Sequence, residues 1–246
     1  MQAEKSFSLK DQLFNLEKVT YLASLFKTVY SEFKEAAFIE EVVTPFPDLE
    51  LKERIHHISQ TLQKYLPASY PEALEIILKG LPPELDPTKN DDDFGDFIMS
   101  PLSQFVADYG CSAEYLEISL NGLEALTRRF SVEGPIRNFI NAFPAETMAF
   151  LDRCADSDNY HVRRLASEGT RPKLPWAQKL VIDYTLPMPI LDKLFADQTR
   201  YVTRSVANHL NDISKIDSAL VIATLAKWKA SGDQAEKEMA FVLSHS

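Results

Sequence analysis

The sequence predicts an all-α protein whose helices stack as repeats into a solenoid. Apolar residues recur at i, i+3 or i+4, and i+7 along most of the 246 residues, which is the period of a helix with one buried face. Seven glycines is few for this length, and they stand singly, which disfavours sheets joined by tight turns. In the second half, one motif recurs after about forty residues, a period typical of stacked helical repeats.

The helices of the first half can be placed from their apolar stripes and end signals. Pro67 and Gly80 mark two of the helix ends, because proline disfavours helical backbone before it and glycine favours a helix stop. Five helices are expected before residue 127, at 9–26, 33–43, 51–65, 71–80 and 115–126.

Residues 81–110 are expected to be one long irregular stretch. It contains the acidic run Asp91–Asp93, which would lie in a solvated loop docked through Phe94, Phe97 and Ile98. The run lacks the acceptor spacing of a calcium-binding helix–loop–helix. The five histidines and two cysteines likewise lack zinc-ligand spacing, so we expect no metal and no cofactor.

The repeat is visible around two Val–x–Arg motifs. Val162 and Arg164 match Val202 and Arg204 at an offset of forty residues, and the same step reaches Val242. A helix pair of this length is the signature of HEAT-type repeats, in which equivalent positions line up on one concave wall. The two arginines should therefore lie in a row, which suits a surface that follows phosphates or one that binds a protein.

Charge is distributed unevenly along the chain. Residues 1–127 hold ten Lys and Arg against 22 Asp and Glu, whereas residues 128–215 hold 13 against ten. Although the net charge is −10, the second half thus has a local basic surface. Salt screening limits the distance over which the field of the acidic half acts. The chain has no long apolar run and no signal-peptide core, so we expect a cytoplasmic protein without a membrane partner. We also expect it to be a monomer.

The sequence NYHVRRLASEGTRPKLPW, residues 159–176, is the most unusual stretch. A helix should stop at Gly169 in a left-handed cap and be followed by a proline-stiffened basic loop. A helix–loop–helix corner with solvated arginines and a core tryptophan would give the same composition. The charged and aromatic residues gathered here are Arg163, Arg164, Glu168, Arg171, Lys173 and Trp176.

Glu133 lies at a second helix junction, because Gly134 and Pro135 end one element and begin the next. A side chain at such a junction is easily presented to a concave face. A first-turn acid that favours the dipole of the following helix is the alternative interpretation.

Five segments together resemble the AlkC family of bacterial DNA alkylation-repair glycosylases, and the resemblance runs from about residue 8 to the end. They are LKERIHHI (51–58), LDPTKNDDDFGDF (85–97), RRFSVEGPIRNFI (128–140), NYHVRRLASEGTRPKLPWA (159–177) and RYVTRSVANHLNDISK (200–215). The resemblance implies a single HEAT-like domain over 1–246 that cradles duplex DNA on its concave face. It also implies removal of N-methylated bases such as 3-methyladenine and 3-methylcytosine without extrusion of the base.

The resemblance also implies site residues. The carboxylates and the tryptophan that match the catalytic region are Glu133, Glu168 and Trp176. The residues expected to contact DNA are Arg163, Arg164, Arg171, Lys173, Arg200, Arg204 and Asn208. Many relatives continue into a further C-terminal helix or an immunoglobulin-like domain, so we expect the last repeat, 216–246, to be incomplete.

A carboxylate suits this chemistry because a 3-methylated base is cationic and leaves as a neutral molecule. The barrier lies in the positive charge that develops on the sugar, which a fixed carboxylate stabilises. A non-catalytic HEAT-repeat module that binds DNA or a protein partner is the alternative function.

Overall fold

The computed structural model describes residues 8–89 and 94–246, and its regular elements within these ranges are helices. Two short 3₁₀ turns, at Phe46–Asp48 and Phe97–Met99, precede α4 and α6. The α-helices are α1 (Leu9–Leu13), α2 (Leu16–Val29), α3 (Glu35–Val43), α4 (Leu51–Tyr65), α5 (Tyr70–Lys79), α6 (Ser100–Gly110), α7 (Leu116–Thr127), α8 (Ile136–Ala142), α9 (Pro144–Cys154), α10 (Tyr160–Glu168), α11 (Met188–Leu194), α12 (Arg200–Ser214), α13 (Ser218–Ser231) and α14 (Glu236–His245).

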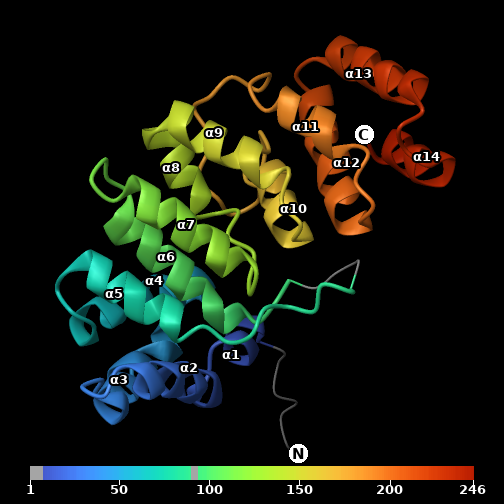
Figure 1. Cartoon of the computed structure of the whole chain (residues 1–246). Helices are drawn as coiled ribbons and strands as arrows, with labels where there is room; N and C mark the ends of the chain where they lie inside the picture. The colour runs from blue at the N-terminus through green and yellow to red at the C-terminus, as the bar shows by residue number, and fades with distance from the viewer. Residues whose placement is uncertain (1–7, 90–93) are drawn as a thin grey trace, which may run out of the picture.

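The helices follow one another as a curved stack from α1 to α14, which confirms the predicted helical-repeat fold (Figure 1). Buried apolar side chains form one continuous core that reaches from Phe14 to Val242. None of the helices in the two described ranges is long and apolar enough to cross a membrane.

The forty-residue repeat is confirmed by three helices. α10 packs against α12, and α12 packs against α14. Val162, Val202 and Val242 are all fully buried at the equivalent position of these helices. The repeat in the sequence therefore reflects one apolar stripe that recurs on successive helices of the stack.

The prediction of one helix over 9–26 is wrong, because the chain breaks at Phe14. Asn15 starts α2 instead: its side-chain oxygen accepts a hydrogen bond from a backbone N–H of the first turn at 3.1 Å. The buried guanidinium of Arg54 fills the break and donates to the carbonyls of Lys10 and Phe14 at 2.9 and 2.8 Å. The Phe14 carbonyl is therefore satisfied without a continued helix, and the Lys10 carbonyl accepts from both Arg54 and the N–H of Phe14.

The stretch expected to be irregular over 81–110 is too long, because α6 begins at Ser100. Asp96 starts the turn before it by accepting a hydrogen bond from the N–H of Ile98 at 3.3 Å. Ile98 is buried, as the docked-loop prediction requires, but Phe94 is 46% exposed. The acidic run 91–93 lies outside the described residues.

The loop before α6 runs against the start of the segment that carries Glu133. Gly95 forms a β-bridge with Phe130 and has a φ of +81°. A Cβ at this position would lie 1.9 Å from the carbonyl oxygen of Arg129, so only glycine permits the approach. This contact carries Phe94 toward α12, where its ring meets Tyr201 edge-on at 5.4 Å.

Gly169 follows α10 as expected, but the predicted left-handed cap is wrong, because its φ is −64°. Glycine is required at this position because a side chain would not fit. A Cβ would lie 2.7 Å from Cγ2 of Ile136 and 2.9 Å from the carbonyl oxygen of Leu165. The missing side chain therefore lets α8 approach the end of α10 closely.

The substitution Gly169→Ala tests this packing. We expect it to lower the free energy of unfolding by about 1–3 kcal/mol, because the added methyl group overpacks the contact with Ile136. Gly134→Ala is the matched control, since a Cβ there meets nothing within 4 Å. Urea denaturation of the three proteins gives the comparison. Equal midpoints for both variants would contradict the close approach of α8 and α10.

Candidate functional site

α10 and α12 pack side by side and present the side chains of the candidate site. Asn159 starts α10 by accepting a hydrogen bond from the N–H of His161 at 2.9 Å. Arg163 then ties α10 to the segment before α12, since its Nε and Nη2 donate to the Asp197 carboxylate at 2.5 and 3.2 Å. The two helices are thus fixed in register at their starts.

A cavity of about 340 Å³ opens between these helices and three neighbouring segments. Six of the residues expected at the site line it: Glu133, Arg164, Glu168, Arg171, Arg204 and Asn208. Its other lining residues are Phe94, Leu174, Pro175, Tyr201 and Ser205. Residues up to 114 positions apart in the sequence therefore line one cavity. We call it the acidic–basic cavity.

Arg164 is the centre of the cavity. It is 7% exposed, and its guanidinium lies between two carboxylates, 3.8 Å from Glu133 and 3.7 Å from Glu168. Nη1 also donates to the Ser131 hydroxyl at 2.8 Å, and that hydroxyl donates to Glu133. The guanidinium lies over the Tyr201 ring, with 4.4 Å between its carbon and the ring centre.

Glu168 is held from several sides. Arg171 donates to one carboxylate oxygen at 2.7 Å, and the Ser205 hydroxyl donates to the other at 2.7 Å. Arg171 is held in turn by Asp212, whose carboxylate accepts from Nε at 3.0 Å. Two arginines and three acids thus form one network across α10, α12, the segment between α7 and α8, and the loop between α10 and α11.

The surroundings push the pKa values of the two glutamates apart. Burial raises the pKa of Glu133, and the charge of Glu168 adds to this, while Arg164 opposes it. Burial would also raise the pKa of Glu168, but Arg164, Arg171 and the hydrogen bond from Ser205 hold it below its ordinary value. The charged form is therefore favoured at Glu168 and disfavoured at Glu133. Glu133 is also more accessible, with a side chain 25% exposed against 7% for Glu168.

Arg137 fixes the loop that closes one side of the cavity. It is 1% exposed, and it donates to the backbone carbonyls of Gly169, Arg171 and Gln178 at 3.2, 2.8 and 2.6 Å. One side chain of α8 thereby spans both ends of the loop 169–178. Arg171 is therefore placed by a buried contact rather than by a flexible loop.

Trp176 lies at the tip of this loop and is 73% exposed, so the interpretation of a core tryptophan is wrong. Its φ of +63° is the one positive φ of a non-glycine residue in the part of the chain that the structure describes. Lys52 donates to its carbonyl oxygen and supports this backbone. The ring lines a smaller cavity of about 220 Å³ beside the first, and Glu133 lines both.

The remaining expected residues fall into different places. Lys173 is exposed and lines a third cavity on the other side of the loop. Arg163 is engaged by Asp197, and Arg200 donates to Glu238 at 2.7 and 2.5 Å, which ties α12 to α14. The structure does not bring these two arginines to the acidic–basic cavity, and their contact with DNA stays a prediction.

Several residues of the site were not expected from the sequence. Tyr201, Ser205 and Asp212 recur on the face of α12 that carries Arg204 and Asn208, so a helical projection of that segment could have found them. Arg137 had one signal, an arginine within the apolar segment IRNFI. Ser131 gave none, because its role depends on the packing of Arg164.

The arrangement can hold a fixed negative charge at the wall of a partly enclosed cavity. The carboxylates of Glu133 and Glu168 lie there, and residues 8–89 and 94–246 contain no group of three or more His, Cys, Asp or Glu side chains placed to hold a metal ion. Such preorganised charge stabilises positive charge that develops on a ligand. Arg204 and Asn208, on the same cavity wall, can bind anionic or polar groups.

The chain was compared with known proteins. It matches no protein-family model. It is 33% identical over 227 residues to the uncharacterized protein YhaZ of Bacillus subtilis, an alignment that covers 88% of this chain and 58% of that protein. It superposes with a TM-score of 0.83 on the Pseudomonas fluorescens alkylpurine DNA glycosylase AlkC bound to DNA containing an abasic site analogue, at 31% identity.

The second match covers 98% of this chain and 64% of the AlkC chain, so the chain spans about three fifths of the length of the two proteins it matches. The agreement extends over nearly every helix of the stack. Sequence identity is above 30% in both comparisons, and the comparison with AlkC also shows a shared fold. The chain belongs to the AlkC-like family.

Proposed function

We propose that this protein is a DNA glycosylase that hydrolyses the N-glycosidic bond of cationic N-alkylated bases in duplex DNA. 3-Methyladenine and 3-methylcytosine are the bases we expect it to remove, as a step of base excision repair. The observation that supports this most directly is the pair of carboxylates held by Arg164 at the wall of one cavity. The likeness in sequence and fold to a DNA-bound alkylpurine DNA glycosylase supports the class of substrate.

The reaction does not need a strong general acid, but it needs a fixed negative charge near the sugar. A base alkylated at N3 is already cationic and departs as a neutral molecule, so it needs no proton from the protein. The sugar becomes positively charged as the bond breaks. A carboxylate at ~4 Å in an effective dielectric of ~20 stabilises that charge by about 4 kcal/mol, or roughly 10³ in rate.

We propose that Glu133 is the carboxylate that faces the sugar. It is the more exposed of the two, and it lines both the acidic–basic cavity and the cavity beside Trp176. Glu168 acts as a positioning residue, since Arg164, Arg171 and Ser205 occupy its oxygens. Glu133 can also orient the water that attacks the sugar.

Selectivity then follows from charge rather than from a pocket shaped for the lesion. An effect of roughly 10³ suffices for a glycosidic bond weakened by alkylation and is too small for a normal nucleotide. Extrusion of the base from the duplex is therefore unnecessary. The exposed ring of Trp176 offers a π face to the cationic nucleotide, and Arg204 and Asn208 are placed to bind the backbone.

Release of free 3-methyladenine and 3-methylcytosine from methylated duplex DNA tests the proposal. We expect release by the wild-type protein and a loss of roughly 10²–10³ in rate for Glu133→Gln, because the carboxamide carries no charge. Glu117→Gln, an exposed position on α7, is the control for removal of a carboxylate elsewhere. Salt-sensitive DNA binding without release would instead support the non-catalytic DNA-binding alternative.

Unfolding measurements separate a catalytic effect from a folding defect. The raised pKa of Glu133 means that the folded state disfavours its charge, so Glu133→Gln should not lower stability at neutral pH. The lowered pKa of Glu168 has the opposite sign, and Glu168→Gln should lower stability at neutral pH. A Glu133→Gln protein that is inactive because it is unfolded would contradict this assignment.

The pH dependence of base release gives a further prediction. The reaction needs Glu133 as a carboxylate, so the rate should rise with pH through its pKa. Because burial raises that pKa, the midpoint of the acid limb should lie above the ordinary value of 4.5. Rates are measured after subtraction of spontaneous release at each pH. A limb at or below 4.5, or one that persists in Glu133→Gln, would show that another group is responsible.

A further inference from the structure

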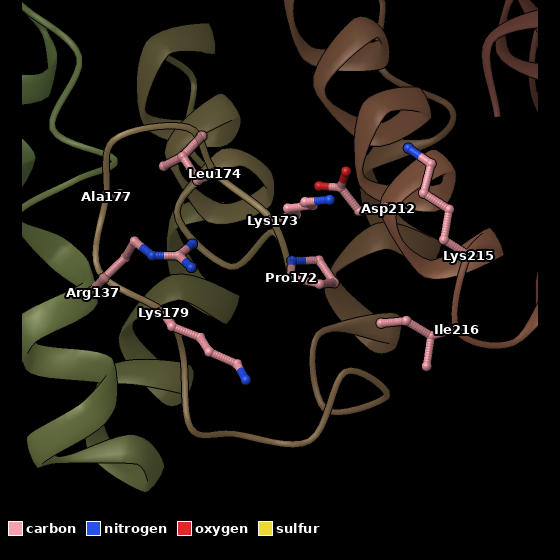
Figure 2. Close-up of a pocket in the computed structure, with 9 residues that line it drawn as sticks. All are labelled: Arg137, Pro172, Lys173, Leu174, Ala177, Lys179, Asp212, Lys215 and Ile216. Atoms are coloured by element: carbon pink, nitrogen blue, oxygen red, sulfur yellow. The ribbon is translucent and has the colours of Figure 1, made fainter.

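A third cavity, of about 420 Å³, lies behind the loop that carries Arg171. Figure 2 shows the guanidinium of Arg137 and the amine of Lys179 on one side of it, with Lys173 and the α12 residues on the other. Lys215 forms part of the α12 side. A volume of this size is within the range of ligand-binding cavities. We call it the basic cavity.

The charges of the basic cavity are unbalanced. Four cations line it, and the one acid, Asp212, is already bonded to Arg171. Within the described residues, the amines of Lys173, Lys179 and Lys215 form no hydrogen bond or ion pair. These unpaired cations give the cavity a positive potential, which favours the binding of an anion although the net charge of the protein is −10.

Arg137 supplies a buried donor to this cavity. Its Nε and Nη1 are bonded to backbone carbonyls, but Nη2 forms no hydrogen bond in residues 8–89 and 94–246. Figure 2 shows the guanidinium directed into the cavity. Burial and the charge of Arg171 lower the pKa of Arg137 to about 10, so it stays cationic at neutral pH. An anion beside it would offset the burial of this charge.

The basic cavity continues the face of α12 that lines the acidic–basic cavity. Asn208 lines the acidic–basic cavity. Asp212, one helical turn farther on, lines the basic cavity, as does Lys215, which follows the last turn of α12. At 1.5 Å per residue, Asn208 and Lys215 are about 10 Å apart along the axis. One DNA strand carries a phosphate about every 3.4 Å along the duplex, so this separation corresponds to about three nucleotides.

We propose that the basic cavity binds a phosphate of the DNA strand, about three nucleotides from the base that is removed. The nature of the ligand rests on the proposed function. Arg137, Lys179 and Lys215 hold the phosphate, and Pro172 and Leu174 offer an apolar surface to the adjacent sugar. The contact fixes the position of the strand without selecting its sequence.

The salt dependence of DNA binding tests this proposal. We expect the double variant Lys179→Gln/Lys215→Gln to reduce the slope of log K against log salt concentration by about one to two, because fewer counterions are released. Lys229→Gln on α13 is the matched control, since its amine has no bonded partner and lies outside the cavity. A slope for the double variant equal to that of Lys229→Gln would overturn the proposal.

Two further measurements identify the source of the phosphate. The accessibility of the Lys179 amine to acetylation is compared in wild type alone, with duplex DNA and with inorganic phosphate. Protection by DNA supports the proposal, whereas protection by inorganic phosphate alone would overturn it in favour of a free anion. Base release is measured on the same samples, so a changed slope without release would leave this inference standing and reject the glycosylase.

Discussion

The whole site depends on one buried cation, the guanidinium of Arg164. It lies between Glu133 and Glu168, and it is shielded from water by the rings of Phe94 and Tyr201. A buried cation without acids would be strongly destabilising, and two acids this close would repel one another without the cation. Arg164 and Glu168 therefore stabilise each other, whereas the charge of Glu133 is disfavoured by its burial. The same burial makes Glu133 effective as a fixed charge when it is ionised.

The arginines that hold backbone carbonyls extend this dependence to the fold. Arg137 bonds three carbonyls of the loop 169–178, and Arg54 bonds the carbonyls at the break between α1 and α2. Each arginine donates from a neighbouring helix to backbone carbonyls where the regular helix is interrupted or absent. The loop 169–178 and the break between α1 and α2 are therefore held by buried contacts, and Arg171 reaches Glu168 with little loss of conformational freedom.

The sequence was sufficient for the features that depend on periodicity and insufficient for those that depend on packing. The forty-residue offset of Val162 and Val202 predicted the stacked helices, because a buried stripe must recur wherever the packing recurs. The function of Gly169 was not predictable, since its cause is the side chain of Ile136 from another helix. Glu133 and Glu168 were found through resemblance and their position at helix ends. Their opposite pKa shifts arise from Arg164 and Arg171 in three dimensions, which no spacing in the sequence encodes.

The central claim is that Glu133 stabilises positive charge on the sugar, and binding of abasic-site analogues tests it most directly. The measurement is the ratio of the Kd values for duplexes that contain a neutral tetrahydrofuran or a cationic pyrrolidine in place of the sugar. We predict that the wild-type protein binds the cationic analogue more tightly by roughly 10²–10³, the factor expected for a carboxylate at ~4 Å. The preference should disappear in Glu133→Gln. Equal affinity of the wild-type protein for the two duplexes, or the same preference in the variant, would contradict the claim.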